Sequence, residues 1–171
     1  LGDPELAAYV LELGQRLGRA VPRASRYEFR IVDDTQPNAF ALPGGHIFVS
    51  RGLLALASSE DELANVVGPE ITHSARRHAS RLEAIQRAQP LLTLPWVSAG
   101  TMASYSRDME READTHGQRI AAAAGYDPAA MATFLAKLEK SQRLVTGYSR
   151  LPWFFDTHPG TRERVGVNSV Q

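Results

Sequence analysis

The sequence predicts one α+β domain over residues 1–171, mostly helical and with one small sheet. Three observations predict this class. Several long segments repeat apolar residues at the spacing of an amphipathic helix, and one short segment alternates apolar and polar residues like a half-buried strand. Two further β-prone runs flank a Pro-Gly-Gly turn, which is typical of a hairpin. The chain is long enough to bury a hydrophobic core.

The N-terminal third is expected to form one helix and then the sheet. The helix begins near Pro4, and its apolar stripe consists of Leu6, Val10, Leu13 and Leu17. In RYEFRIVDD, the residues Tyr27, Phe29 and Ile31 alternate with charged ones, which predicts a strand. AFALPGGHIFVS then predicts a hairpin that turns at residues 43–45, and SRGLLALA turns helical.

Two long helices are expected in the middle of the chain. The first begins after Ser59, which fits a capping box with Glu62, and continues to about Ala79. The second covers SYSRDMEREADTHGQRIAAAAG and ends at Gly125.

A third helix is predicted to restart at Asp127 and Pro128, which suit the N-cap and the first helical position. Its buried stripe consists of Met131, Phe134, Leu135 and Leu138. Residues 146–157 are aromatic and irregular, and a short last helix is expected near Gly160.

Composition excludes several classes of function. The formal net charge is zero, so we expect no nucleic-acid partner. Cysteine is absent, so any metal must be held by histidines and carboxylates. No apolar run is long enough to span a bilayer, and the most apolar stretch is broken by Pro95. Because the chain begins at Leu1 without a methionine, we expect that an N-terminal piece was removed or left out.

The stretch GPEITHSARRH comes close to a zinc-binding motif. In HExxH on a helix, two histidines four residues apart reach one zinc ion, and the glutamate activates the bound water. Glu70 and His73 occupy the second and last positions of this pattern, but Pro69 stands at the first. Taken alone, His73 is better explained as a polar residue on a helix surface.

The block EREAD on the next long helix offers further carboxylates. Glu110 and Asp114 are four residues apart and therefore share a face. Glu110 could bind a metal ion, and Asp114 could orient a metal ligand. The alternative is a solvated face of mixed charge, which is common on helices.

The histidines at positions 46, 78 and 116 give no ligand pattern. His78 follows His73 by five residues, about 140° around a continuous helix, so we expect it to be structural or exposed and to serve a different target. His46 in the hairpin and His116 on the EREAD helix have no partner at ligand spacing.

Five blocks in order carry a family resemblance: NAFALPGGHIFVSRGLL, EDELANVVGPEITHSARRH, YSRDMEREAD, AGYDP and THPGTRERV. From about Asn38 to Val165 the chain closely resembles the HExxH zinc metallopeptidases of the HtpX, BepA and CAAX prenyl protease type. The resemblance implies a zincin-like (gluzincin) fold. It also implies one zinc ion and hydrolysis of peptide bonds in extended or misfolded polypeptides.

The resemblance assigns roles to single positions of this chain. Glu70 matches the general base, and His73 matches the second zinc-binding histidine. Glu110 matches the zinc-binding glutamate, and Asp114 matches the aspartate that supports the ligands.

Further matches lie at both ends of the resembling region. His158 matches a histidine that faces the active site, where it stabilises the transition state or caps the zinc, and Arg164 matches the arginine that accompanies it. The edge strand beside the substrate cleft is matched by Asn38, Ala39, Phe40 and Ala41, where an extended peptide could add as a further strand.

Pro69 is the one departure from the family pattern. Proline has no metal-binding side chain, and it lacks the N–H that would bond the Asn65 carbonyl. In a helix interior it costs about 3 kcal/mol or more and usually kinks the helix. We therefore expect weak zinc binding and low or no activity.

Several interpretations of Pro69 stay open. The zinc site could be rebuilt from His73, Glu110 and His158. The chain could be an inactive pseudo-protease that binds polypeptides like a chaperone, or a structural or assembly module of the same ancestry. Pro69 could also be a recent, deliberate or erroneous change, since histidine and proline codons differ by one base. The resemblance and the absence of a spanning helix favour a periplasmic or cell-envelope location in a bacterium, with membrane-associated partners possible.

Overall fold

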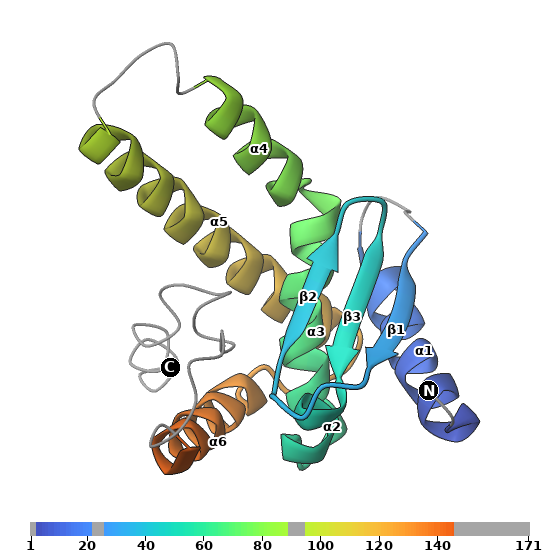
Figure 1. The fold of residues 1–171 in the computed structure, drawn as a ribbon. Helices are drawn as coiled ribbons and strands as arrows, with labels where there is room; N and C mark the ends of the chain where they lie inside the picture. The colour runs from blue at the N-terminus through green and yellow to red at the C-terminus, as the bar shows by residue number, and fades with distance from the viewer. Residues whose placement is uncertain (1–2, 22–25, 89–94, 146–171) are drawn as a thin grey trace.

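The computed structural model describes residues 3–21, 26–88 and 95–145, and it confirms the α+β class (Figure 1). The elements in chain order are α1 (Pro4–Arg19), β1 (Glu28–Val32), β2 (Ala39–Leu42), β3 (His46–Ser50), α2 (Arg51–Leu56), α3 (Glu60–Ala75), α4 (His78–Ala88), α5 (Pro95–Ala123) and α6 (Ala130–Val145). The predicted irregular stretch 146–157 and the helix near Gly160 lie outside the described residues.

The sheet contains the predicted strand and hairpin, with strand order β1-β3-β2. β2 and β3 are antiparallel, and Phe40 lies opposite Phe48 with the two rings stacked at 5.0 Å. The turn between them needs glycine, because Gly44 and Gly45 have φ angles of 96° and 91°. β1 joins the other side of β3 in parallel, which leaves β2 at one edge of the sheet.

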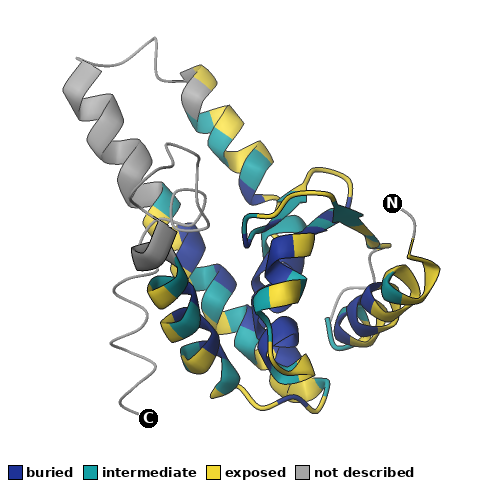
Figure 2. Cartoon of the chain, turned by 60° about the horizontal axis from the view of Figure 1, so that its bottom comes forward, coloured by how far each residue is buried: buried dark blue, intermediate teal, exposed yellow. Residues whose placement is uncertain are grey.

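Helix α3 is the centre of the molecule, and buried residues gather where it meets its neighbours (Figure 2). α1 packs against the sheet and α3 through Val10, Leu13 and Leu17 of the predicted stripe. The predicted stripe of α6 is buried as well. Within the described ranges, no helix combines the length and the apolarity that a bilayer crossing requires.

α3 and α5 approach each other through glycine. A Cβ atom on Gly117 would lie 2.4 Å from the backbone nitrogen of Pro69, and one on Gly68 would lie 2.6 Å from the carbonyl oxygen of Gly117. Pro69 lies inside α3 without ending it. The close crossing therefore buries Pro69 at the contact between the two helices.

Three predicted boundaries were wrong. α3 ends at Ala75 instead of about Ala79, because Arg77 adopts a left-handed φ of 53° and the chain turns before α4 begins at His78. α5 begins at Pro95, well before the predicted SYSRDM segment. α6 begins at Ala130, because Asp127 caps a preceding turn through a 2.9 Å bond from the Ala129 N–H.

The capping box at the start of α3 is also different from the prediction. The Glu62 N–H does donate to Ser59 Oγ, at 3.2 Å. The Glu62 carboxylate, however, accepts from the Ser58 N–H at 2.8 Å and from Lys137 of α6. The Glu62 side chain, which was predicted to cap the start of α3, therefore also connects α3 to α6.

Candidate functional site

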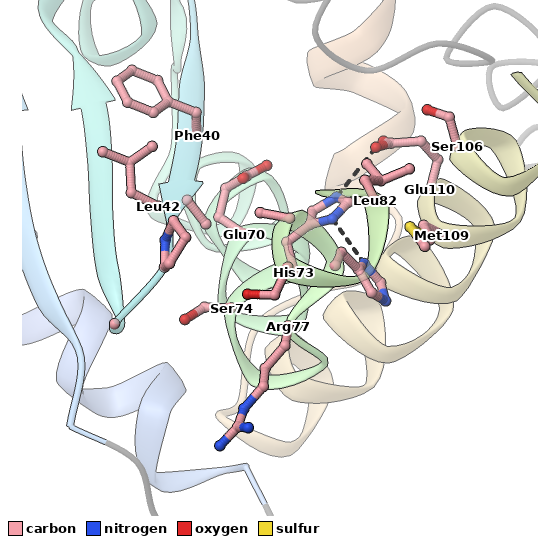
Figure 3. A pocket seen from close by; sticks show the side chains of 16 residues that line it. Phe40, Leu42, Glu70, His73, Ser74, Arg77, Leu82, Ser106, Met109 and Glu110 are labelled. Atoms are coloured by element: carbon pink, nitrogen blue, oxygen red, sulfur yellow. Dashed lines mark hydrogen bonds and ion pairs between the residues drawn. The ribbon is translucent and has the colours of Figure 1, made fainter. Parts of the chain in front are cut away.

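A cavity of about 480 Å³ lies beside the edge strand β2 (Figure 3). Its wall on one side comes from β2 and the turn that follows. The opposite wall comes from the end of α3, the start of α4 and the middle of α5. The cavity therefore lies along the free side of the sheet, where an extended ligand has access to both backbone and side chains.

Three residues singled out from the sequence meet in this cavity. Glu70 and His73 come from α3, and Glu110 comes from α5. Glu70 is only 2% exposed, and His73 Nε2 lies 3.3 Å from Glu110 Oε1. Two zinc ligands with bonds of about 2.0–2.1 Å in a tetrahedron are also about 3.3–3.4 Å apart. The spacing therefore suits a direct ion pair and equally two corners of a metal site.

Pro69, which stands where the HExxH pattern has its first histidine, is buried against α5 and does not line the cavity as far as the chain is described. In that same part of the chain, no group of three or more histidine, aspartate or glutamate side chains could hold a metal ion. Catalytic zinc sites use about three protein ligands. His73 and Glu110 are two side chains of ligand type, so the described residues do not complete such a set.

The other predicted site residues fall into two groups. Phe40 and Ala41 lie on β2 and line the cavity, with Asn38 and Ala39 just before them along the same strand edge. Asp114 is half-buried one turn after Glu110 but does not contribute to the described lining. His158 and Arg164 lie outside the described residues.

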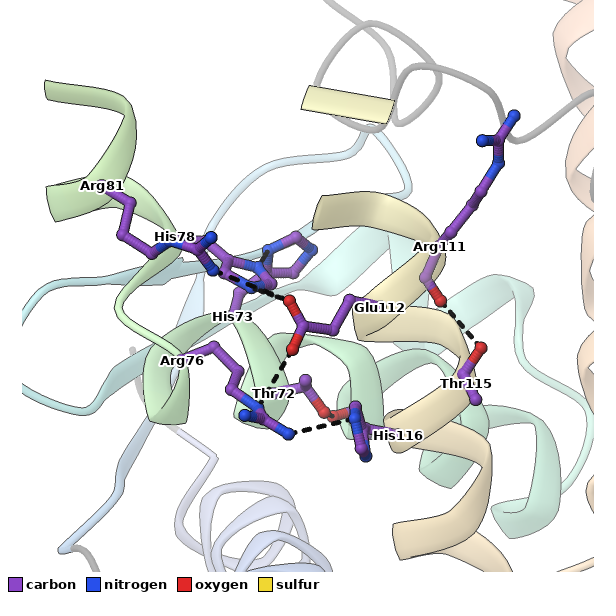
Figure 4. Close-up of polar contacts among 10 residues, drawn as sticks. Thr72, His73, Arg76, His78, Arg81, Arg111, Glu112, Thr115 and His116 are labelled. Atoms are coloured by element: carbon purple, nitrogen blue, oxygen red, sulfur yellow. Dashed lines mark hydrogen bonds and ion pairs between the residues drawn. The ribbon is translucent and has the colours of Figure 1, made fainter. Parts of the chain in front are cut away.

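His78 lies closer to His73 than the assumption of one continuous helix predicted. It is 2% exposed, lines the cavity, and its Nδ1 lies 2.9 Å from His73 Nδ1 (Figure 4). The prediction assumed one continuous helix, but the turn at Arg77 brings His78 back over the end of α3. No glycine or proline marks this turn, so the sequence held no signal for it.

Burial lowers the pKa of His78, and the neighbouring His73 and Arg81 add to this effect. The Glu112 carboxylate acts in the opposite direction, with its Oε2 at 3.2 Å from His78 Nε2, but it does not reverse the shift. The lowered pKa favours the neutral form of the His78 ring.

Glu112 anchors a cluster of charges behind the two histidines. Its Oε1 lies 3.3 Å from Arg76 Nε, and its Oε2 lies 3.7 Å from Arg81 Nη1. Arg76 also contacts His116 Nε2 at 3.1 Å. Two glutamates of the EREAD block therefore lie in different places. Glu110 lines the cavity, and Glu112 contacts residues at the corner between α3 and α4.

Comparison with known proteins places these features in a family context. Peptidase family M48 matches residues 1–104 and residues 85–167 of the chain. The beta-barrel assembly-enhancing protease of Yersinia pestis is 33% identical over 184 residues, covering 92% of this chain and 37% of that protein. The protein of the same name from Escherichia coli (strain K12) is 32% identical over 193 residues, covering 96% and 38%.

A mitochondrial relative is similar as well. The mitochondrial metalloendopeptidase OMA1 of Schizosaccharomyces pombe is 29% identical over 154 residues, which cover 82% of this chain and 45% of that protein. The chain therefore spans less than half the length of each of these relatives.

Proposed function

The chain belongs to peptidase family M48, and on that premise we propose that it is a metalloendopeptidase domain that holds an extended polypeptide along β2 and in which Pro69 weakens zinc binding and hydrolysis. One observation carries the proposal. Glu70, His73 and Glu110 line a single cavity beside the edge strand. The family implies a metal, and the printed names of the relatives describe proteases and metalloendopeptidases.

The hydrogen-bond pattern of β2 supports a peptide-binding role. The Ser50 N–H donates to the Asn38 carbonyl at 2.9 Å, so this pair is a hydrogen-bonded one. Pairs alternate along an antiparallel ladder, which makes Ala41 and Ile47 a non-hydrogen-bonded pair. The N–H and C=O of Ala41 therefore point away from β3, toward the cavity side, where a substrate strand could bond them.

The side chains would have distinct tasks in hydrolysis. Glu70 would accept the proton of the attacking water as general base, as its match to the family motif implies. His73 and Glu110 would hold the metal with a third ligand, for which His158 is the candidate. Arg164, with His158 where that ring is not a ligand, would stabilise the tetrahedral oxyanion. Asp114 would support the ligand arrangement.

A second function is favoured by the incomplete donor set. With two donors among the described residues, the chain could bind polypeptides without cutting them. The cavity and the β2 edge would serve that role unchanged, because neither requires a metal ion. Extended or misfolded polypeptides as ligands, membrane-associated partners and a cell-envelope location belong to the proposal in both versions.

Zinc content and peptide cleavage together test the metalloendopeptidase version. Elemental analysis would be made on protein purified without chelators, for the wild-type chain and for Pro69→His. We expect much less than one zinc per wild-type chain and close to one for Pro69→His, together with cleavage of an unfolded test protein. Pro69→Ala is the matched control, since it restores the N–H but no ligand. A zinc-loaded wild-type chain would instead favour a site rebuilt with His158, and an inert, zinc-loaded Pro69→His would contradict the assigned catalytic role.

Peptide binding is tested separately. Ala41→Pro removes the outward N–H without removing a β2–β3 bond, so binding of an extended peptide should weaken while the circular dichroism spectrum is kept. Ala41→Val keeps the N–H and should bind like the wild-type chain. Equal binding by both variants would exclude strand addition at β2.

A further inference from the structure

Arg77 brings a positive charge to the wall of the cavity beside β2. Among the described lining residues it is the only arginine or lysine, whereas Glu70 and Glu110 line the same cavity with carboxylates. Arg77 is exposed, and within the described ranges its guanidinium group has no hydrogen bond or ion pair. The nearby Arg76 and Arg81 both contact a carboxylate of α5. In this part of the chain, Arg77 therefore has a charged group that is available to a ligand.

The backbone of Arg77 indicates that packing alone does not favour arginine at this position. Its φ angle is 53°, and no other non-glycine residue in the described part of the chain has a positive φ. In the left-handed region the Cβ atom crowds the following carbonyl oxygen, and glycine avoids this cost because it has no Cβ. Glycine would therefore suit the fold better, and a strained arginine on a cavity wall points to a role in binding.

The position of Arg77 along α3 sets where on a bound peptide it would act. Arg77 follows Glu70 by seven positions, which corresponds to a rise of about 10 Å along a helix. In Figure 3, Arg77 lies beyond Ser74 as seen from Glu70, and Leu42 follows Phe40 along β2 in the same direction. An extended peptide advances about 3.3 Å per residue, so a strand beside β2 would bring to Arg77 a side chain about three residues from the one at Glu70.

We propose that Arg77 selects polypeptide segments that carry an acidic side chain about three residues from the bond held at Glu70. The inference rests on the proposed function, because it names a feature of the peptide that the same cavity would hold. A guanidinium group can donate two parallel hydrogen bonds to the oxygens of one carboxylate. The distance of about 10 Å from Glu70 exceeds the Debye length of about 8 Å in physiological salt, so Glu70 repels such a side chain only weakly.

Fluorescence anisotropy with a matched pair of labelled peptides tests the proposal on the wild-type chain. Both peptides are extended, apolar and blocked at both ends, and they differ only in carrying one glutamate or one glutamine. We expect the glutamate peptide to bind about two- to fivefold more tightly, the range typical of a solvent-exposed ion pair. The preference should shrink at high salt, because salt screens an exposed pair.

Three variants separate recognition of charge from a structural role. Arg77→Gly should bind the two peptides equally, while its midpoint of urea unfolding should not fall, because glycine tolerates the left-handed backbone. Arg77→Lys keeps the charge and should keep most of the preference. Arg87→Gln lowers the net charge equally, and it should leave the preference unchanged because Arg87 pairs with Glu83 and does not contribute to the described lining.

The outcomes distinguish this inference from the proposed function. Equal binding of the two peptides by the wild-type chain overturns the inference, and so does an undiminished preference in folded Arg77→Gly. In both cases the peptides still bind, so the proposed function stands. Failure of both peptides to bind the wild-type chain would overturn the proposed peptide-holding role and this inference together.

Discussion

Replacing Lys137 with methionine tests how much its ion pair with the buried Glu62 carboxylate stabilises the packing of α6 on α3. Both oxygens of Glu62 accept from Lys137 Nζ, at 2.6 and 2.7 Å. The Ser58 N–H and the Thr133 hydroxyl donate to the same carboxylate at 2.8 and 2.9 Å. The Glu62 side chain is 5% exposed and that of Lys137 is 35% exposed. The substitution would leave a buried anion with two neutral donors.

The expected loss follows from these surroundings. Removing one partner of a fully buried ion pair costs about 3–5 kcal/mol. Lys137 is partly solvated and two donors remain, so we expect a loss of about 2 kcal/mol in the free energy of unfolding. Lys140 on the same helix is exposed, and Lys140→Met should change stability by less than about 0.5 kcal/mol. Urea unfolding followed by far-ultraviolet circular dichroism measures both values.

The pH dependence of folding stability gives a second, independent test of this ion pair. Burial alone would raise the pKa of Glu62, but the hydrogen bonds from Lys137, Ser58 and Thr133 outweigh burial and lower it. In the wild-type chain this stabilisation is present above the unfolded pKa of about 4.3 and is lost as the pH falls through the lower folded value. Without Lys137, burial favours the protonated acid. The stability gap between the two proteins should therefore narrow as the solution is acidified.

Two results would refute this reasoning. One is a Lys137→Met chain that loses no more stability than Lys140→Met. The other is a stability gap that widens toward acidic pH, since that would mean that Lys137 does not stabilise the ionised carboxylate.

Two further predictions concern helix packing and a buried phenol. Gly117→Ala should destabilise the chain by about 1–3 kcal/mol, because the added Cβ would lie 2.4 Å from the Pro69 nitrogen. The control is Gly18→Ala, whose Cβ would meet only the Tyr27 ring, at 3.2 Å. It should cost less stability in the same urea titration. Burial and the Glu60 carboxylate raise the pKa of Tyr126 to about 12, so ultraviolet titration should show a late tyrosine that Tyr126→Phe removes. The folded chain keeps the Tyr126 proton to a higher pH than the unfolded chain does, so wild-type stability should fall from about pH 10 upward. The stability of Tyr126→Phe should fall less. Equal pH profiles of stability would contradict the assignment.

Local patterns in the sequence were enough for most of the elements. The stripe of α1, the alternation in β1 and the Pro-Gly-Gly turn predicted the correct types of structure, because helix and strand periods depend on residues that are near in the chain. The spacing of Glu70 and His73 likewise placed both on the wall of one cavity. The departure at Pro69 was also visible in the sequence alone.

Tertiary structure decided the features that join distant segments. The sequence contains the Glu62–Lys137 pair and the Gly68–Gly117 crossing, but no local pattern connects either pair of residues. The contact between His73 and His78 depends on a left-handed Arg77, which no local preference predicts. The φ angle of Arg77 sets the direction in which α4 leaves α3. The contacts that favour this direction come from residues far away in the chain, through the packing of α4 on α5 and the ion pairs of Glu112.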